Sequence, residues 1–307
     1  MEKPASTGQN IITVPVLKVE GNAFTRGDDL LAVEEPLQIR LNYESRGVKR
    51  EKDISITMRT PGHDFELAAG FLYSEGILRN RGQVVEIRQT GPEDNPRQQR
   101  NRVTVSVKPG TDLDLGRLKR NFYVSSSCGI CGKASIERLH DLHYPSLPED
   151  IPLVEASVIH RLPGALREGQ AIFNRTGGLH AAGLFDTEGH LVGLWEDVGR
   201  HNAVDKLIGD EFLKDHIPLS NHILMVSGRT SFELAQKALM AGIPILASVG
   251  APSSLSVEIA LRYQMTLLGF VRDGRFNIYS GAARIGKAKK NGQSLPPYRT
   301  VPLSADA

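Results

Sequence analysis

Residues 223–249, ILMVSGRTSFELAQKALMAGIPILASV, decide the fold class of this chain. A short apolar run, Ile223–Val226, leads through a polar turn to Thr230-Ser-Phe-Glu233, which matches the capping box that opens a helix. A glycine and a proline end that helix after Ala241, and a second apolar run covers residues 245–249. A strand, a helix and a strand in this order predict parallel strands joined by a right-handed crossover.

The same α/β pattern continues on both sides of this stretch. After it, Ala251-Pro-Ser-Ser254 caps a further helix, and Asp273-Gly274 turns a strand pair. Before it, Asp186-Thr-Glu-Gly189 turns a hairpin, and Asn202 or Asp205 opens a helix after a loop. We expect helices over residues 158–169 (interrupted near Pro163), 202–212 and 255–264, and strands over residues 179–185, 191–196, 266–270 and 275–279.

The first half of the chain is expected to be rich in strands. Apolar and polar residues alternate in several short runs, and one longer amphipathic run follows Pro61-Gly-His-Asp64. The predicted strands cover residues 14–20, 37–43, 54–59, 84–88 and 103–107, and the predicted helix covers residues 65–78. Three prolines within residues 144–152 mark a boundary between two domains. We therefore expect a loose N-terminus over residues 1–10, a β-rich N-terminal domain over 11–143, an α/β domain over 150–283 and a basic tail over 284–307.

Composition narrows the range of functions. A formal net charge of +2 over 307 residues is too balanced to indicate binding to nucleic acid or to a membrane surface. The N-terminus lacks the apolar segment of a signal peptide, and no apolar run approaches the ~20 residues of a membrane span. The two cysteines stand close together without a disulfide framework, which favours a reducing, cytoplasmic compartment.

Those two cysteines lie in Ser125-Ser-Ser-Cys128-Gly-Ile-Cys131-Gly132, before a run that reads as a helix. A thiol on a glycine-flanked loop that enters a helix N-terminus is accessible, and the helix dipole favours its thiolate. The pattern therefore favours reactive sulfur chemistry. Three other readings stay open: a pair of buried structural cysteines, a thioredoxin-like disulfide, and a zinc site completed by His140 and His143 at spacings shorter than usual.

Polar loops in the second half indicate a ligand site. In an open α/β sheet, ligands bind beyond the carboxyl ends of the strands. Ser227-Gly228-Arg229 joins a strand end to a helix start, so its backbone N–H groups and guanidinium suit a phosphate. Neither a Walker A lysine motif nor Gly-x-Gly-x-x-Gly is present, which argues against ordinary ATP or NAD binding. The other loops of this kind are Thr176-Gly-Gly-Leu-His180, Asp197-Val-Gly-Arg-His-Asn202 and Ala251-Pro-Ser-Ser254.

Several of these segments together resemble the FdhD family of sulfur carrier proteins, which formate dehydrogenase activity requires. The resemblance covers about residues 30–285. The segments that carry it, in chain order, are CGICG, TGGLHAA, EDVGRHNAVDK, SGRTSFE, APSSL and the run Gly269–Tyr279.

The resemblance implies a role in cofactor maturation. The family takes sulfur as a persulfide from a cysteine desulfurase and passes it to the molybdenum of bis-molybdopterin guanine dinucleotide, the cofactor of formate dehydrogenase. The family's persulfide cysteine falls on Cys128, and Cys131 would be a helper. Its cofactor-binding segment falls on Phe270, Val271, Arg272, Asp273, Gly274 and Arg275, to which the strand-end loops would add His180, Ser227 and Arg229.

The resemblance also implies a fold and an assembly. The larger domain would have a three-layer fold similar to that of cytidine deaminases, and the protein would pair as a homodimer. Deaminase chemistry needs a His-x-Glu and a Pro-Cys-x-x-Cys motif. Here Ala181 and Ala182 follow His180, and no cysteine lies in the second half, so we expect no metal of the protein's own. The alternative is a zinc-stabilised chaperone that binds the molybdenum cofactor without sulfur chemistry.

Overall fold

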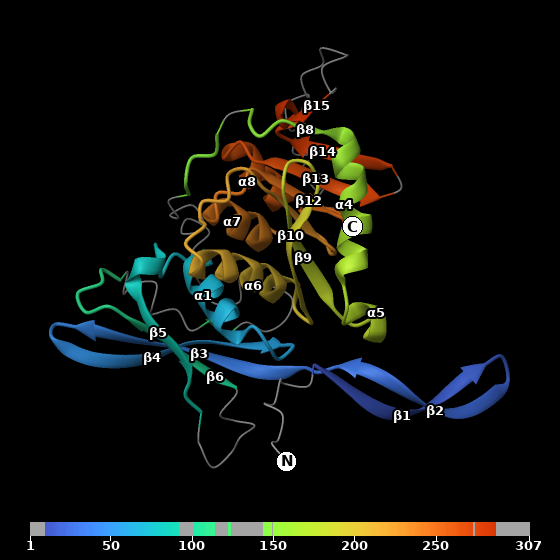
Figure 1. Ribbon diagram of the computed structural model, residues 1–307, viewed down its shortest axis with the longest axis horizontal. Helices are drawn as coiled ribbons and strands as arrows, with labels where there is room; N and C mark the ends of the chain where they lie inside the picture. Colours follow the sequence, from blue (N-terminus) through green and yellow to red (C-terminus); the bar gives the residue numbers. More distant parts are fainter. Residues whose placement is uncertain are drawn as a thin grey trace, which may run out of the picture.

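The computed structural model describes residues 10–91, 101–113, 122–123, 144–148, 150–272 and 274–286. Within these ranges the chain forms two main sheets, with helices packed between and outside them (Figure 1). The predictions for residues 1–9, for the cysteine-bearing stretch with its following helix, and for the tail beyond residue 286 lie outside the described residues.

The larger sheet has six strands in the order β10-β9-β11-β12-β13-β14. As predicted, β11, β12 and β13 run parallel, and two antiparallel hairpins extend them. Asp186 stabilises the turn of the first hairpin, because its carboxylate accepts hydrogen bonds from the backbone N–H groups of Glu188 and His190. The strands are β9 (His180–Phe185), β10 (Leu191–Asp197), β11 (Ile223–Val226), β12 (Ile245–Ser248), β13 (Thr266–Arg272) and β14 (Arg275–Ser280).

Helices cover both faces of this sheet. Strand side chains alternate between the faces, so Met225 of β11 packs in the core under α4 (Ala156–Gly169), whereas its neighbour Leu224 packs under the helices opposite. Those helices are α6 (Arg200–Leu213), α7 (Phe232–Met240) and α8 (Ser254–Arg262). The arrangement confirms the predicted α/β class, while the specific likeness to cytidine deaminases stays a prediction.

The smaller sheet has five strands in the order β5-β6-β3-β4-β7. One face packs on α1 (Asp64–Ser74), which contributes the buried Leu67 and Leu72 against Ile39 and Val105 of the sheet. The strands, all predicted except β7, are β3 (Glu35–Ser45), β4 (Val48–Arg59), β5 (Val84–Gln89) after a 3₁₀ turn at Arg81–Gln83, β6 (Arg102–Val107) and β7 (Phe122–Tyr123).

Helices α1 and α6 join the two sheets by packing backbone against backbone. A Cβ placed on Gly70 of α1 would lie 1.9 Å from the carbonyl oxygen of Asp205. One placed on Gly209 of α6 would lie 1.8 Å from the carbonyl oxygen of Glu66. Only glycine permits this approach. One cluster of buried side chains therefore runs from the smaller sheet through both helices to the larger sheet, and the domain boundary near residue 150 stays a prediction.

A two-stranded ribbon projects from this body (Figure 1, lower right). β1 (Ile11–Glu20) contains the predicted strand, and it pairs along its whole length with β2 (Ala23–Ala32), which the sequence analysis missed. Near the tip, Leu17, Val19 and Phe24 are exposed by 58%, 55% and 67%. The ribbon contacts the body near its base, where β2 meets the short helix α5 (Phe173–Thr176).

The structure corrects three expectations. α4 continues through Pro163, because its buried face holds the helix on the sheet on both sides of the proline. α6 begins at Arg200, earlier than predicted, with Gly199 as its N-cap; Asp197 fixes the loop before the helix by accepting a hydrogen bond from the N–H of Gly199. The N-cap of α7 is Ser231 rather than Thr230, and no side chain caps it, so the predicted capping box does not form.

Short elements close the second half. β8 (Val154–Glu155) pairs with β15 (Ile285–Gly286), which follows a 3₁₀ turn at Ala282–Arg284. The buried guanidinium of Arg284 ties this end to the start of the second half by donating to the carbonyl oxygens of Ile151 and Gln264. None of the helices in the described ranges is both long and apolar enough to cross a membrane.

Candidate functional site

The candidate site is the edge of the larger sheet where its parallel strands end. β10, β11, β12 and β13 all run toward this edge, and β9, which is antiparallel to them, starts there at His180. The loops β10–α6, β11–α7 and β12–α8 leave the sheet at the same edge. The topology therefore brings together three of the four polar loops that the sequence singled out, and the fourth ends at His180.

Hydrogen bonds donated by backbone N–H groups join these loops to one another. The hydroxyl of Ser227 accepts from the N–H of Ala181 at 2.9 Å, which ties the β11 loop to β9. The N–H of Gly250 donates to the carbonyl of Gly228 at 3.1 Å, and the N–H of Phe270 donates to Gly250 at 3.0 Å. The predicted residues His180, Ser227 and Phe270 thus belong to one connected edge.

Gly228 lies close to two side chains at this edge, those of His180 and Arg200. A Cβ on Gly228 would lie 3.4 Å from Nδ1 of His180 and 3.8 Å from Cδ of Arg200. Burial and, to a lesser extent, the positive charge of Arg200 lower the pKa of His180 below its ordinary value. His180 is therefore neutral near pH 7 and can either donate or accept a hydrogen bond.

The edge carries positive potential. The N-termini of α6, α7 and α8 all open from it; the hydroxyl of Ser253 caps α8, whereas the N-cap residues of α6 and α7 make no side-chain capping hydrogen bond. Nε of Arg200 is buried and has no hydrogen-bond partner in the part of the chain that the structure describes. The side chain of Arg229 is exposed beside Gly250. Such an edge favours an anion, and phosphate oxygens would satisfy the buried Nε of Arg200.

His201 is a second neutral histidine at this edge. Burial, followed by the charges of Lys237 and Arg200, lowers the pKa of His201 to about 4. Its Nε2 lies 3.1 Å from the hydroxyl of Ser231 at the N-cap of α7. The imidazole therefore stays uncharged at neutral pH and links the starts of α6 and α7.

The segment that the resemblance assigned to cofactor binding extends this edge. Phe270 has a positive φ of 54°, and the strand pair shifts register between Gly269 and Arg272. Arg272, Gly274 and Arg275 are exposed at the tip of the β13–β14 hairpin. The side chain of Val271 packs in the core under α4, so it does not face the edge. Asp273 lies outside the described residues.

The predicted reactive cysteines, Cys128 and Cys131, lie outside the described residues, as do His140 and His143 of the zinc reading. The described element before them is β7, which pairs in parallel with β4: Phe122 with Ser55 and Tyr123 with Ile56. Across the described ranges, no group of three or more histidine, cysteine, aspartate or glutamate side chains could hold a metal ion.

Comparison with known proteins identifies the family. A sequence model of the FdhD/NarQ family matches residues 32–286. The chain belongs to the FdhD/NarQ family. Among FdhD/NarQ relatives, the sulfur carrier protein FdhD of Streptomyces avermitilis is 47% identical over 272 residues, which cover 88% of this chain and 94% of the relative. That of Saccharolobus solfataricus is 41% identical over 278 residues, which cover 91% and 99%.

A solved structure supports the FdhD/NarQ assignment. The crystal structure of a protein from Desulfotalea psychrophila, assigned as a formate dehydrogenase accessory protein, matches with a TM-score of 0.67 and 25% identity. The match covers 90% of this chain and 99% of that one. The resemblance read from the sequence is confirmed as to family.

Two residues of this FdhD/NarQ chain stand at the edge although the sequence analysis gave them no role of their own: Arg200 and His201. The sequence indicated that this segment is polar. Only the folded structure shows that Nε of Arg200 is buried, with no hydrogen-bond partner among the described residues, and that burial removes water from around His201. The sequence feature that could have indicated an anion-binding role for Arg200 is its position directly after the glycine of a strand-to-helix loop.

Proposed function

We propose that this protein is a sulfur carrier that serves formate dehydrogenase. Cys128 accepts sulfur from a cysteine desulfurase as a persulfide, and the sulfur passes to the molybdenum of bis-molybdopterin guanine dinucleotide. Membership of the FdhD/NarQ family and the sulfur carrier relatives support the carrier role. The proposal extends to a homodimer with a cytidine-deaminase-like domain that works in the cytoplasm.

The observation that carries the ligand half of the proposal is that Nε of Arg200 is buried beside three helix N-termini, with no hydrogen-bond partner among the residues that the structure describes. A guanine dinucleotide carries pyrophosphate groups, whose oxygens match guanidinium and backbone N–H donors. Because Gly228 and Gly250 have no side chain, His180 and Arg200 can lie close to the backbone at Gly228, and Arg229 close to the backbone at Gly250. The neutral imidazoles of His180 and His201 add hydrogen bonds without adding charge.

The sulfur half has two balanced steps. In loading, the thiolate of Cys128 attacks the outer sulfur of the desulfurase persulfide; a sulfur–sulfur bond forms on Cys128 and the desulfurase thiolate leaves, without net oxidation. In delivery, the thiolate of Cys131 attacks Sγ of Cys128, so a Cys128–Cys131 disulfide forms and hydrosulfide leaves. The two thiols supply the two electrons. Hydrosulfide and a proton replace an oxygen ligand of the molybdenum, which departs as water, and a dithiol reductant restores the pair.

Replacing Cys128 tests the sulfur half. After incubation with a cysteine desulfurase and cysteine, the wild-type protein should gain one reducible sulfur atom in its intact mass. Cys128→Ala should neither gain that sulfur nor restore formate dehydrogenase activity, whereas Ser127→Ala should do both. Cys131→Ala should load normally and deliver more weakly, because an external thiol can replace the resolving step.

Two outcomes would contradict the sulfur half of the proposal. One is a folded Cys128→Ala protein that still restores formate dehydrogenase activity. The other is one bound zinc per chain with no gain of sulfur, which would support the zinc-stabilised chaperone instead.

The ligand half of the proposal is tested by calorimetric titration of the wild-type protein with guanosine diphosphate and adenosine diphosphate. We expect the guanine nucleotide to bind more tightly, by about 1–3 kcal/mol, and to raise the melting temperature accordingly. Equal binding of the two nucleotides would contradict it.

A further inference from the structure

One fully buried carboxylate, that of Asp197, lies where the two halves of the chain meet below the candidate site. Its side chain has no exposed surface. Oδ1 accepts from the N–H of Gly199 at 2.8 Å and from Nδ2 of Asn202 at 3.0 Å. Oδ2 accepts from the N–H of Thr60 at 3.1 Å and from Nζ of Lys206 at 2.8 Å. The carboxylate thus uses its full capacity of about four hydrogen bonds.

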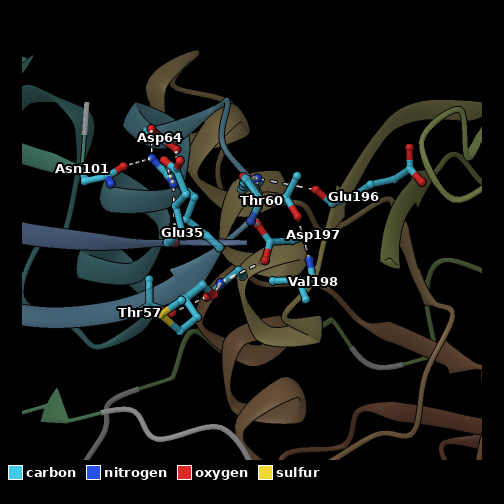
Figure 2. Close-up of polar contacts among 12 residues, drawn as sticks. Glu35, Thr57, Thr60, Asp64, Asn101, Glu196, Asp197 and Val198 are labelled. Atoms are coloured by element: carbon cyan, nitrogen blue, oxygen red, sulfur yellow. Dashed lines mark hydrogen bonds and ion pairs between the residues drawn. The ribbon is translucent and has the colours of Figure 1, made fainter. Parts of the chain in front are cut away.

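Its two oxygens serve different parts of the protein. Gly199 and Asn202, the partners of Oδ1, flank Arg200 and His201, so Oδ1 holds the start of α6, where the two edge residues lie. Oδ2 holds the end of β4 through Thr60 (Figure 2). One carboxylate therefore fixes the ligand-facing loop of the second half against a strand of the first half.

Further contacts make this junction specific. Every polar group of Thr60 bonds to the second half: its N–H to Asp197, its carbonyl to Nζ of Lys206 at 2.9 Å, and its hydroxyl to the N–H of Val198 at 3.2 Å. Nδ2 of Asn202 donates to the carbonyl of Met58 at 2.7 Å. These partners are about 140 residues apart in sequence, so the contacts fix the position of β4 relative to α6.

β4 is also the strand with which β7 pairs, and the chain runs from β7 into the stretch that contains Cys128 and Cys131. β4 and β7 run in the same direction, toward Thr60. The junction therefore lies between the strand pair that precedes the sulfur-bearing residues in the chain and the start of α6, which bears Arg200. Transfer between two groups depends steeply on their alignment, because a displacement of about 1 Å can cost about 10²-fold in rate.

We propose that Asp197 is a positioning residue for sulfur delivery: through its two oxygens it aligns the start of α6, which carries Arg200 and His201, with β4, the partner strand of β7. This inference rests on the proposed function. It predicts that loss of the Oδ2 contacts slows delivery while loading of Cys128 and binding of guanosine diphosphate continue.

The test uses two matched double variants. Removing only one member of a buried ion pair leaves an unpaired charge, so both members are neutralised together. Asp197→Asn with Lys206→Met keeps an acceptor for Gly199 and Asn202 but breaks the contacts to Thr60. The control, Asp205→Asn with Lys237→Met, removes another buried ion pair of α6, which joins α7 and does not touch β4.

Four quantities are measured for each full-length protein: the melting temperature, the calorimetric Kd for guanosine diphosphate, the gain of one sulfur atom in intact mass, and the single-turnover rate at which the loaded protein activates unsulfurated formate dehydrogenase. The Asp197–Lys206 variant should deliver at least about tenfold more slowly than wild type. Its Kd and sulfur loading should stay within about twofold of wild type, as should all activities of the Asp205–Lys237 control.

Three outcomes would each overturn the inference. Both double variants could lose delivery equally, the Asp197–Lys206 variant could deliver at the wild-type rate, or that variant could lose affinity for guanosine diphosphate to the same extent as it loses delivery. If the Asp197–Lys206 variant does not fold, the delivery rates of Thr60→Val and Thr60→Ser test the inference instead. The hydroxyl that accepts a hydrogen bond from the N–H of Val198 is lost in Thr60→Val and kept in Thr60→Ser. Slower delivery by Thr60→Val alone supports the inference, and equal delivery by both overturns it. A wild-type protein that neither loads sulfur nor binds guanosine diphosphate overturns the proposed function instead.

Discussion

At the scale of single residues, packing sets the chemical state of the candidate site. His201 is next to Arg200 and near Lys237, and burial removes most of the water that would stabilise its charged form. A histidine in a polar sequence such as Val198-Gly-Arg-His-Asn202 would be expected to titrate near its ordinary pKa. The folded chain holds the pKa of His201 at about 4.

This lowered pKa predicts a pH dependence of stability. Below the ordinary pKa of 6.5, the unfolded chain binds a proton at His201 that the folded chain does not bind until about pH 4. The free energy of unfolding should therefore fall as the pH drops from about 6.5 to about 4, by roughly 3 kcal/mol from this residue, and this contribution should stay flat above about pH 7. Urea unfolding at a series of pH values measures the effect.

In the same measurements, His201→Gln should flatten this slope. His180 and His222, whose pKa values burial also lowers, add to the slope in the same direction, whereas His63, whose pKa Glu66 raises, opposes it. A His201→Gln protein with the wild-type slope would show that His201 titrates normally in the folded state.

The sequence predicted some edge residues and not others, for a physical reason. Ser227 and Arg229 were predictable because a polar turn between an apolar run and a helix start must lie at a strand end. Three of the four contacts of Asp197 are to nearby residues of the second half, but the contact that joins the two halves, from the N–H of Thr60, comes from a residue 137 positions away. No local sequence pattern predicts a contact with so remote a residue, so the sequence indicated only that Asp197 belongs to a polar loop.

At the scale of elements, the contact of α1 with α6 runs against local propensity. Glycine inside a helix costs about 1 kcal/mol relative to alanine, so propensity alone predicts that Gly70→Ala and Gly209→Ala stabilise the protein. Because each new Cβ would lie within 2 Å of a backbone oxygen, we expect each variant to destabilise the protein by at least about 3 kcal/mol or to prevent folding. Denaturant unfolding measures the change.

Gly164→Ala is the matched control for these variants. Gly164 is an exposed residue of α4, and nothing lies within 4 Å of its added Cβ. This variant should stabilise the protein by about 0.5–1 kcal/mol. Stabilisation by all three alanines would mean that α1 and α6 do not touch as described.

Element prediction succeeded where a strand or helix buries one face of its own. The runs that became β11, β12 and α7 are apolar because they fill the core on both sides of a sheet. β2 was missed because Ala23–Ala32 carries charged residues and faces solvent, so its strand conformation depends on pairing with β1 rather than on burial. α4 was predicted to break at Pro163 because a local rule was applied without the sheet that supports the helix.

At the scale of the whole molecule, the β1–β2 ribbon is separate from the shared core. An isolated two-stranded hairpin is marginally stable in water, and this one meets the body mainly at its base. A chain that starts at Val33 should therefore melt within about 5 °C of the full-length protein. Thermal unfolding, with light scattering to measure the mass in solution, checks this prediction.

A much larger fall in melting temperature would show that the ribbon is covered in solution. If the measured mass also halves on truncation, the cover is a second copy of the chain that uses the exposed Leu17, Val19 and Phe24. A matched variant, Phe24→Ser in the full-length protein, should then reproduce the change in mass. Unchanged mass in both proteins would place any dimer contact elsewhere.

The junction at Asp197 also has a consequence for how the protein is made. Thr60 leaves the ribosome 137 residues before Asp197 does, and at about 5–20 residues per second this gap lasts roughly 7–27 s. During that time the face of α1 that will pack on α6 has no partner, and the backbone groups of Thr60 can bond only to water. The first half must therefore wait, incompletely folded, for the second half to be synthesised, and a bound chaperone during that interval would protect it from aggregation.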